Sequence, residues 1–387
     1  MLFLDQINTR DKRVLIRMDF NVPISKGEII NDARIRASLP TIKLALRSNA
    51  AIMLLSHLGR PTEGKYDQNL SLQPIANHLS SLLNQDVRLI REWTDGVEVK
   101  LGEVVLLENV RFQAGESKNE EEFARKIAAL CDVFVMDAFG TAHRKQASTF
   151  GVIKFAPIAC AGPLLRSEID ALNKVLQEPK RPIVAIVGGS KVSTKLAVLK
   201  KLSTIVDYLI VGGGIANTCI ATKDINIGKS LYERNMLDTA TELLEDRDNQ
   251  AMIPLPVDVV VSDVLSGDGK ARIKAIEDIQ DDELILDIGP ATANNFSKII
   301  SQASTILWNG PLGVFELDQF SEGTRAVCEA IAESNSFSVA GGGDTLAAIE
   351  KYGISDDISY ISTGGGAFLE FLGGKILPSI EMLQKRA

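Results

Sequence analysis

The sequence predicts an α/β protein with two domains, each built on a mainly parallel sheet. Its 387 residues exceed the roughly 250 to 300 residues at which a single hydrophobic core usually stops growing. Short apolar runs alternate with helical patterns, as they do in βαβ units. In the second half, strand-like runs end repeatedly in glycine clusters. This pattern suits open sheets that bind ligands beyond the carboxyl ends of their strands.

The first half alternates strand-like and helix-like segments of the lengths found in βαβ units. Each apolar run is followed by a segment with helical spacing, so the strands are expected to be parallel neighbours. The expected strands are 14–20, 51–57, 104–110 and 133–139, and the expected helices between them include 38–46, 72–83 and 121–130.

Polar and charged residues, most of them arginines, follow each of these strands. Parallel strands place their carboxyl ends at one edge of a sheet, so these side chains should converge. Converging arginines in an acidic chain indicate a small polyanionic ligand held by bidentate guanidinium contacts. A solvated surface position is the better interpretation for any one arginine, but not for the set. The residues are Asp19 and Asn21 after the first strand, Arg34 and Arg36 at the next helix, His57 and Arg60 after the second strand, Arg111 after the third, and His143 and Arg144 after the fourth.

Two features of the first half have a plainer interpretation. His57 and His143 are equally consistent with ordinary half-buried histidines, and neither has the spacing of a metal pair. The segment GRPTEGKY, 59–66, nearly matches the phosphate-loop pattern GxxxxGK followed by Ser or Thr. We reject that match because Tyr66 replaces the Mg²⁺-binding hydroxyl and no helix pattern follows at once.

A helix is expected to join the two domains. It begins at Pro163 and carries apolar residues at helical spacing through Leu176, after which QEPKRP, 177–182, ends it. The second sheet then begins with PIVAIVGG, 182–189.

The clearest glycine cluster lies in FSVAGGGDT, 337–345. Glycines leave their N–H groups accessible to an anion, and the positive end of the following helix adds to the attraction. Asp344 would repel a bare phosphate, which suggests a bridging Mg²⁺; an N-cap role for this residue is at least as common. The other clusters lie in 184–191, 209–217 and 361–368.

Further charged residues lie beside glycine turns. Lys191 and Lys195 are expected on one face of a helix, where a phosphate between them would reverse their mutual repulsion; two solvated lysines are the usual alternative. LWNGPLGVFE, 307–316, is another strand that runs into a glycine–proline turn. Its Glu316 is placed for sugar hydroxyls or is solvated.

Composition limits the possible functions. A net charge of −8 and a pI near 5.2 argue against a general nucleic-acid or membrane-surface role. No apolar run approaches the roughly 18 residues of a membrane span, and the N-terminal segment lacks a signal core. We therefore expect a soluble cytoplasmic protein. The widely spaced Cys131, Cys160, Cys219 and Cys328 predict buried, reduced thiols.

A series of ordered motifs runs along nearly the whole chain. They are RMDFNVP (17–23), RIRASLPTI (34–42), SHLGRP (56–61), LLENVRF (106–112), DAFGTAHR (137–144), GGSKVSTK (188–195), WNGPLGVFE (308–316), GGGDT (341–345) and STGGGA (362–367). Through these motifs the chain resembles the phosphoglycerate kinase family. The resemblance implies two Rossmann-like three-layer α/β/α domains, joined by a helix and separated by a cleft, with the C-terminal tail packed on the N-terminal domain. It implies a phosphoglycerate-binding domain, 1–170 plus a tail from about residue 370 to 387, and a nucleotide-binding domain, 171–369.

The implied reaction is reversible phosphoryl transfer from 1,3-bisphosphoglycerate to MgADP, giving 3-phosphoglycerate and MgATP, by hinge closure and direct in-line transfer. The implied cofactor is Mg²⁺, and the implied partners are these small-molecule substrates. No nucleic acid or membrane partner is expected, and the protein is expected to be a monomer. No candidate nucleophile paired with a general base stands out. This suits an acyl phosphate, whose accepting oxygen is already ionised and needs only alignment and charge neutralisation.

The resemblance also implies site residues, at the positions that match the family's motifs. Two small departures, Met136 where Asn is expected and Thr363 in the last glycine loop, touch no charge that the mechanism needs. The implied phosphoglycerate site is Asp19, Asn21, Arg34, His57, Leu58, Gly59, Arg60, Arg111 and Arg144. The implied nucleotide site is Lys195, Gly212, Gly213, Gly214, Asn309, Leu312, Glu316, Gly341, Gly342, Gly343, Asp344 and Thr345, with Asp344 on Mg²⁺. Arg34, Lys191, Lys195, Gly364, Gly365 and Gly366 would surround the phosphoryl group in transfer.

Two alternatives belong to other classes. A nicotinamide-dependent dehydrogenase would suit two such domains, but no GxGxxG follows the first strand, and no glycine loop has the acidic partner of a ribose-binding fingerprint. A non-catalytic binding protein for a phosphorylated metabolite would bind ligand without turnover, so a coupled ATP assay separates it from a kinase.

Overall fold

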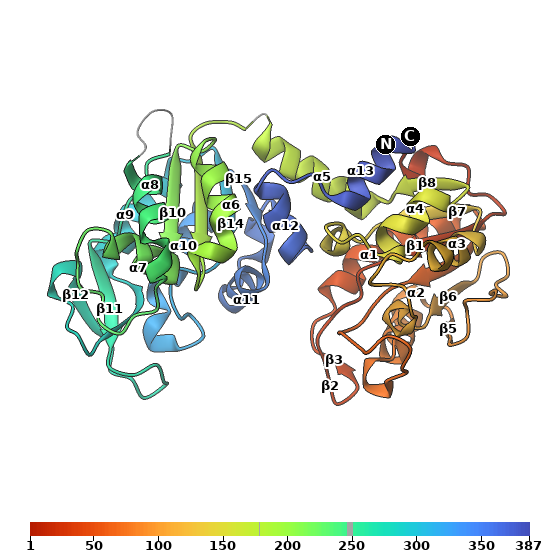
Figure 1. The fold of residues 1–387 in the computed structure, drawn as a ribbon, viewed down its shortest axis with the longest axis horizontal. Coiled ribbons are helices and arrows are strands. Elements are labelled where there is room, and N and C mark those ends of the chain that lie inside the picture. The colour runs from red at the N-terminus through yellow and green to blue at the C-terminus, as the bar shows by residue number, and fades with distance from the viewer. Residues whose placement is uncertain (178, 246–250) are drawn as a thin grey trace. The chain divides into compact units, whose positions relative to one another are not determined.

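The structure is a computed structural model that describes residues 1–177, 179–245 and 251–387. The chain divides into two compact units: Met1–Asp170 with Ile376–Ala387, and Ala171–Lys375. The division falls inside helix α5, Pro163–Leu176 (Figure 1). The chain therefore passes out of the first unit within α5 and returns to it for its last twelve residues, 376–387.

The first unit is built on a six-stranded sheet in the order β5-β6-β4-β1-β7-β8, in which every neighbouring pair is parallel. The expected parallel sheet is therefore confirmed. Its strands are β1 Arg13–Arg17, β4 Ala51–Leu55, β5 Val87–Ile90, β6 Val104–Leu107, β7 Val133–Met136 and β8 Ile158–Ala161. Its helices are α1 Ala33–Arg47, α2 Gln73–Leu83, α3 Glu121–Ala129, α4 Val152–Phe155 and α13 Pro378–Lys385, and β2 Ile24–Ser25 pairs with β3 Glu28–Ile29.

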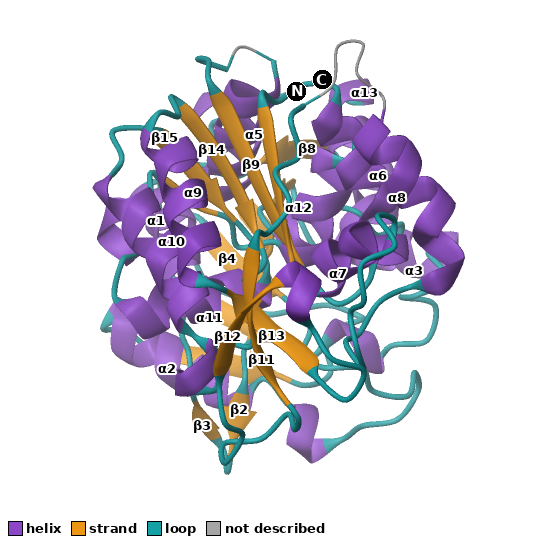
Figure 2. Ribbon diagram, turned by 90° about the vertical axis from the view of Figure 1, so that its left-hand side faces the viewer, coloured by secondary structure: helices purple, strands orange, loops and turns teal. Residues whose placement is uncertain are grey.

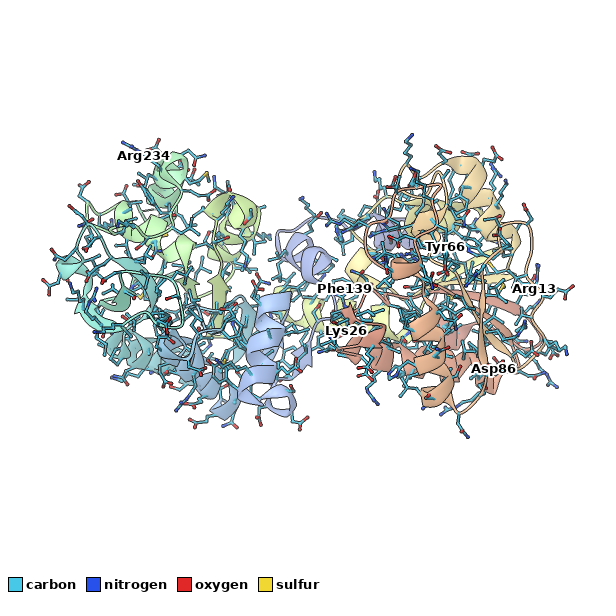
Figure 3. The ribbon with its side chains drawn as sticks, turned by 90° about the horizontal axis from the view of Figure 1, so that it is seen from below. Arg13, Lys26, Tyr66, Asp86, Phe139 and Arg234 are labelled. Atoms are coloured by element: carbon cyan, nitrogen blue, oxygen red, sulfur yellow. The ribbon has the colours of Figure 1, made fainter. Side chains whose placement is uncertain are left out.

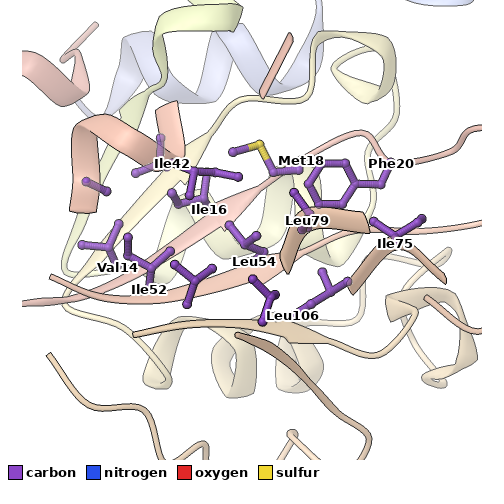
Figure 4. Packing of buried hydrophobic residues seen from close by; sticks show 14 of the residues in the cluster. Val14, Ile16, Met18, Phe20, Ile42, Ile52, Leu54, Ile75, Leu79 and Leu106 are labelled. Atoms are coloured by element: carbon purple, nitrogen blue, oxygen red, sulfur yellow. The ribbon is translucent and has the colours of Figure 1, made fainter. Parts of the chain in front are cut away.

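Helices cover this sheet on both faces because strands β4, β6 and β7 are apolar at every position. Strands β4, β6 and β7 are buried throughout, as strands covered on both faces are. Alternate residues such as Ile16 and Leu54 join one core cluster with Ile42 of α1 and Leu79 of α2 (Figure 4). The tail helix α13 contacts α4 and β8 of the same unit.

The second unit contains a parallel sheet in the order β10-β9-β14-β15-β16 and a separate antiparallel sheet, β12-β11-β13. Figure 2 shows α6, α7 and α8 on one side of the parallel sheet and α9 and α10 on the other. The strands are β9 Ile183–Gly188, β10 Tyr208–Gly212, β11 Asp258–Ser262, β12 Arg272–Ala275, β13 Leu284–Ile288, β14 Thr305–Asn309, β15 Phe337–Ala340 and β16 Tyr360–Ile361. The helices are α6 Val192–Ser203, α7 Gly214–Ala221, α8 Leu237–Glu245, α9 Pro290–Ser301, α10 Glu322–Glu333, α11 Gly343–Tyr352 and α12 Gly365–Leu372.

Charged side chains such as Arg13, Asp86 and Arg234 project outward, whereas Phe139 is buried (Figure 3). All four cysteines are buried and free, as their spacing predicts. In the described part of the chain, no helix has the length and apolar character needed to cross a membrane.

Candidate active site

Short loops after the first unit's strands bring several of the predicted residues into contact. The Arg34 guanidinium lies 3.4 Å from the Asp19 carboxylate and donates to the Asn21 carbonyl at 2.9 Å. The Asn21 side chain accepts from Gly59 N–H at 2.8 Å. Gly59 has φ +61°, a conformation that favours glycine. Residues from the loop after β1, from α1 and from the loop after β4 thus form one polar cluster.

Leu58 and Arg36, which were predicted with these residues, do not contribute side chains to the polar cluster. Leu58 is buried, and its carbonyl accepts from the Asn109 side chain at 2.8 Å, so it holds the loop through its backbone. Arg36 pairs with Asp32 on its own helix at 2.9 Å. It does not join the cluster of arginines.

Arg60, Arg111 and Arg144 line one cavity of ≈ 210 Å³, together with Gln146, Ser117 and Glu63. Arg111 donates to the Gly59 carbonyl at 2.6 Å. Its other terminal nitrogen, Nη2, is buried with no hydrogen-bond partner among the described residues. Burial, and next the charges of Arg144 and Arg17, lower the pKa of Arg111 to about 10. An unsatisfied buried donor beside other cations is the setting in which an anion binds.

His57 contacts a buried arginine that the sequence analysis did not select. Arg17 Nη2 lies 3.2 Å from His57 Nδ1, and a guanidinium has donors only. His57 Nδ1 must therefore accept, which leaves the ring neutral with its proton on Nε2. Burial, and then the charge of Arg17 and of the neighbouring arginines, holds the pKa of His57 well below its usual value.

Arg17 is linked through Ser148 to Glu116, an acidic residue that the sequence analysis also missed. Its Nε donates to Ser148 Oγ at 3.0 Å, and Ser148 donates to the Glu116 carboxylate at 2.6 Å through Oγ and at 2.9 Å through N–H. Both Arg17 and Glu116 are fully buried. A charged residue inside the apolar run VLIRMDF was the available signal, because such residues are rarely buried without a partner.

In the second unit, the five strands of the parallel sheet all lead into glycine-containing loops, as expected from the glycine clusters. Beside these loops lies a cavity of ≈ 380 Å³. Five predicted residues line it: Gly213, Gly214, Leu312, Glu316 and Asp344. Much of its remaining wall is apolar and comes from β13 and nearby loops, including Leu231, Leu265, Leu284, Leu286 and Ile288.

Lys195 lies where the strand ends meet. Its Nζ donates to the Gly188 carbonyl and to the side-chain and backbone oxygens of Asn309 at 2.6 and 3.3 Å. Asn309 in turn donates to the Gly341 carbonyl at 2.6 Å, and Thr345 donates to the same carbonyl at 2.9 Å. Burial lowers the pKa of Lys195 to about 8, and the charge of Asp344 opposes this shift.

The structure corrects two expectations about helix ends. Lys191 is the N-cap residue of α6 and is exposed, so it precedes the helix and does not share a helical face with Lys195. Asp344 lies in the first turn of α11, whose N-cap is Gly342 at φ +106°. The alternative role of Asp344 as an N-cap is therefore wrong.

The last glycine loop lies next to the GGGDT loop. Gly364 caps α12, and its N–H donates to Ser362 Oγ at 3.2 Å. A Cβ added to Gly341 would lie 2.8 Å from the ring of Phe368 in α12. Only glycine therefore allows this close approach between the GGGDT loop and α12.

Asp344 is the predicted protein ligand of Mg²⁺ at this site. The described residues contain no group of three or more His, Cys, Asp or Glu side chains that could hold a metal. Asp344 is in the first turn of α11, at the rim of the larger cavity. One carboxylate together with ligand phosphates and water is a common way for proteins to hold Mg²⁺, so the donor set fits.

Comparison with known proteins gives a consistent result. The sequence profile of the family described as phosphoglycerate kinase matches residues 4–375. The solved phosphoglycerate kinase from Coxiella burnetii is 53% identical, with 100% of this chain and 99% of that chain covered and a TM-score of 0.94. The phosphoglycerate kinase from Pyrococcus horikoshii OT3 is 35% identical, with 100% and 99% covered and a TM-score of 0.86.

Proposed function

The chain belongs to the phosphoglycerate kinase family, and we propose that its first unit binds phosphoglycerate and its second unit binds the nucleotide. The enzyme catalyses reversible phosphoryl transfer between 1,3-bisphosphoglycerate and ADP, giving 3-phosphoglycerate and ATP. The assignment of substrates to units rests on the contrast between the two cavities.

The first cavity suits a small anion. Three arginines line it, and the buried Nη2 of Arg111 lacks a partner among the described residues. Phosphoglycerate has a carboxylate and a phosphate, the groups that guanidinium binds through paired hydrogen bonds. His57, with its proton on Nε2, offers one further donor. Asp19 and Asn21 hold the Arg34 guanidinium, the first through an ion pair and the second through a hydrogen bond to its carbonyl.

The second cavity suits a nucleotide. Its apolar wall and glycine loops can accept a flat base, and most ligand pockets combine such walls with a few polar groups. Glu316 lies on the same wall and is placed for ribose hydroxyls. The N–H groups of the GGGDT loop and the positive end of α11 attract the phosphates.

Transfer needs no general base. A terminal oxygen of ADP, already ionised, attacks the phosphorus of the acyl phosphate; the new P–O bond forms as the bond to the carboxyl oxygen breaks, and a carboxylate leaves. Lys195, Lys191, Arg34 and the amides of Gly364 to Gly366 neutralise the charge that develops on the transferred group. When bound with the nucleotide, Mg²⁺ adds charge neutralisation at the phosphates.

We propose that the two substrates meet through closure of the two units. Closure would also exclude water, which would otherwise hydrolyse the acyl phosphate. The pair 3-phosphoglycerate and MgADP has no transferable group, so it traps the state without turnover. The radius of gyration from small-angle X-ray scattering should fall with both ligands and change less with either alone; an equal value in all cases would contradict closure.

Calorimetry on two variants tests the assignment of sites. Arg60→Ala should weaken 3-phosphoglycerate binding by about tenfold or more, the scale of one charged hydrogen bond, and leave ADP binding unchanged. Glu316→Ala should weaken ADP binding and leave 3-phosphoglycerate binding unchanged. If Arg60→Ala instead weakened ADP binding, the nucleotide would lie among the arginines and the assignment would be wrong.

Three further statements belong to the same proposal: the nucleotide acts as its Mg²⁺ complex, the protein works in the cytoplasm, and it is a monomer. The single carboxylate of Asp344 supports the first. Four buried free thiols suit a reducing compartment. Light scattering after gel filtration tests the statement that the protein is a monomer.

A further inference from the structure

An irregular segment, 228–233, forms part of the wall of the nucleotide cavity. Its first half is hydrogen-bonded to Glu283 and to the first residues of β13. Lys229 N–H donates to the Glu283 carbonyl at 2.8 Å, and Ser230 Oγ accepts from Ile285 N–H at 2.8 Å. The close approach requires Gly228, because a Cβ there would lie 2.3 Å from the Glu283 carbonyl.

Leu231 is the residue of this segment that lines the cavity. Its carbonyl accepts from the side chain of Asn217, in α7, at 3.1 Å, and its side chain is 55% exposed. An exposed leucine beside an apolar cavity can be covered by a ligand that binds there. Its position over the cavity depends on what holds the two ends of the segment.

Glu233 holds the second end. Its carboxylate accepts from Ser193 N–H at 2.7 Å and from Ser193 Oγ at 2.5 Å, at the first turn of α6. Its own N–H donates to Thr218 Oγ1, in α7, at 3.1 Å. The hydrogen bonds from Ser193 keep the pKa of Glu233 below its usual value, so the carboxylate is charged at neutral pH.

The helix that Glu233 holds carries the candidate catalytic residue Lys195 and begins directly after the other, Lys191. Lys191 is the N-cap of α6, and no side chain of the cap itself satisfies the helix end. Glu233 supplies that acceptor from another segment, which stabilises a helix N-terminus as a capping acid does. One carboxylate therefore joins the cavity wall at Leu231 to the helix of Lys191 and Lys195.

We propose that Glu233 is a positioning residue for the nucleotide: it fixes Leu231 against the base cavity and fixes α6 relative to that wall. This inference rests on the proposed nucleotide site in the second unit. Glu233 is not part of the first unit, so its effect should be confined to the nucleotide.

The test compares Glu233→Ala, Glu233→Gln and the wild type in calorimetry with ADP and in steady-state kinetics. Glu233→Ala should weaken ADP binding and raise the KM for MgADP by about three- to tenfold, as expected for losing hydrogen bonds to a charged acceptor near the surface. The KM for 1,3-bisphosphoglycerate and the melting temperature should stay close to wild type. Glu233→Gln keeps one acceptor oxygen and should recover most of the affinity.

Glu242→Ala is the matched control, because Glu242 also pairs with α6, through Lys200 at 3.8 Å, but does not line the cavity. It should bind ADP as the wild type does. Unchanged ADP affinity in Glu233→Ala, or equal changes in the KM of both substrates, would overturn the proposal. If Glu233→Ala fails to fold, Ser193→Ala gives the same comparison.

The wild-type measurement separates this inference from its premise. A wild type that fails to bind ADP would contradict the nucleotide site itself. Normal binding in the wild type with no loss in Glu233→Ala would contradict only the role of Glu233.

Discussion

Lys195 is bound by neutral oxygens only, among the hydrogen bonds that the structure describes: the carbonyls of Gly188 and Asn309 and the amide oxygen of Asn309. None of these cancels its positive charge, so the charge is available to a phosphate. Burial makes the charged form less stable and lowers the pKa to about 8. A bound phosphate would raise it again.

We expect Lys195→Ala to fold normally and to lower kcat by about 10²-fold or more, the scale of losing one charged contact in the transition state. In the wild type, kcat/KM for MgADP should fall as the pH rises through about 8, because the free enzyme then loses the lysine proton. That decline should vanish in the variant. Lys200→Ala, an exposed position on the same helix, is the control, and near-normal turnover in Lys195→Ala would remove this lysine from the mechanism.

His57 gives a second test at the scale of single residues. ¹⁵N NMR of the imidazole should show a protonated Nε2 and an unprotonated Nδ1 across neutral pH, with the signal assigned by its loss in His57→Gln. An unfolded histidine gains its proton near pH 6.5, while the buried ring does not. The unfolded state therefore binds a proton that the folded state does not, and the free energy of unfolding decreases as the pH falls below that value. An imidazolium spectrum at neutral pH would contradict the contact with Arg17.

The sequence predicted most of the residues that the structure brings together, but not their supports. Asp19 and Arg111 were predictable because each follows a strand of the parallel sheet, and Arg34 because it lies at the start of the next helix. Arg17 and Glu116 were not selected: the apolar run around Arg17 was a signal for its burial, but the link to Glu116 through Ser148 joins distant residues and leaves no local pattern. Glu233 was missed for the same reason: its partner Ser193 lies 40 residues away.

At the scale of elements, the strand ends of the second unit approach each other too closely for side chains. A Cβ on Gly188, at the end of β9, would lie 1.8 Å from the carbonyl oxygen of Pro311. The Cβ position is fixed by the Gly188 backbone and the oxygen belongs to the Pro311 backbone, so no side-chain rotation can relieve the clash. The glycine clusters therefore serve packing between loops as well as access for an anion.

Gly188→Ala should destabilise the second unit by about 1–3 kcal/mol or more, the usual cost of overpacking. Gly267→Ala is the matched control, because a Cβ there meets nothing within 4 Å, and its effect should stay within about 0.5 kcal/mol. Urea unfolding can be followed by the fluorescence of Trp308, which belongs to the second unit, in a Trp93→Phe background. Equal midpoints for the two variants would show that the loop after β14 moves aside at little cost.

Some elements could not be predicted from pattern alone. Strands β5 (VRLI) and β8 (IACA) lack the uninterrupted run of large apolar residues that indicated β6 and β7, because β5 contains Arg88 and β8 contains two alanines. The antiparallel sheet of β11 to β13 interrupts a series of βαβ units, and only the pairing of distant residues such as Val259 and Ile288 defines it. The strands that could be predicted from local sequence were those with a long apolar run followed by glycine or by arginine.

At the scale of the whole molecule, the two units are joined by α5 and again just before Ile376. The last twelve residues, 376–387, therefore complete the core of the unit that the chain left at Asp170. Ser379 N–H donates to the Ala142 carbonyl at 3.2 Å, and Arg386 donates to the Ala156 carbonyl at 2.6 Å. These contacts tie α13 and its C-cap residue to the chain on both sides of the candidate site residue Arg144.

Leu383 provides the test of this tie, because it is fully buried, whereas Ile376 in the same tail is 72% exposed. Leu383→Ala should destabilise the first unit by about 2–5 kcal/mol, the range for removing a buried leucine, and Ile376→Ala by no more than about 0.5 kcal/mol. Trp93 belongs to the first unit, so its fluorescence in a Trp308→Phe background reports that unit's unfolding. Because Leu383 belongs to the first unit and Trp308 to the second, the Trp308 signal in Trp93→Phe should keep its midpoint when Leu383 is shortened. A loss confined to the Trp308 signal would assign the tail to the second unit and contradict the division at Ile376.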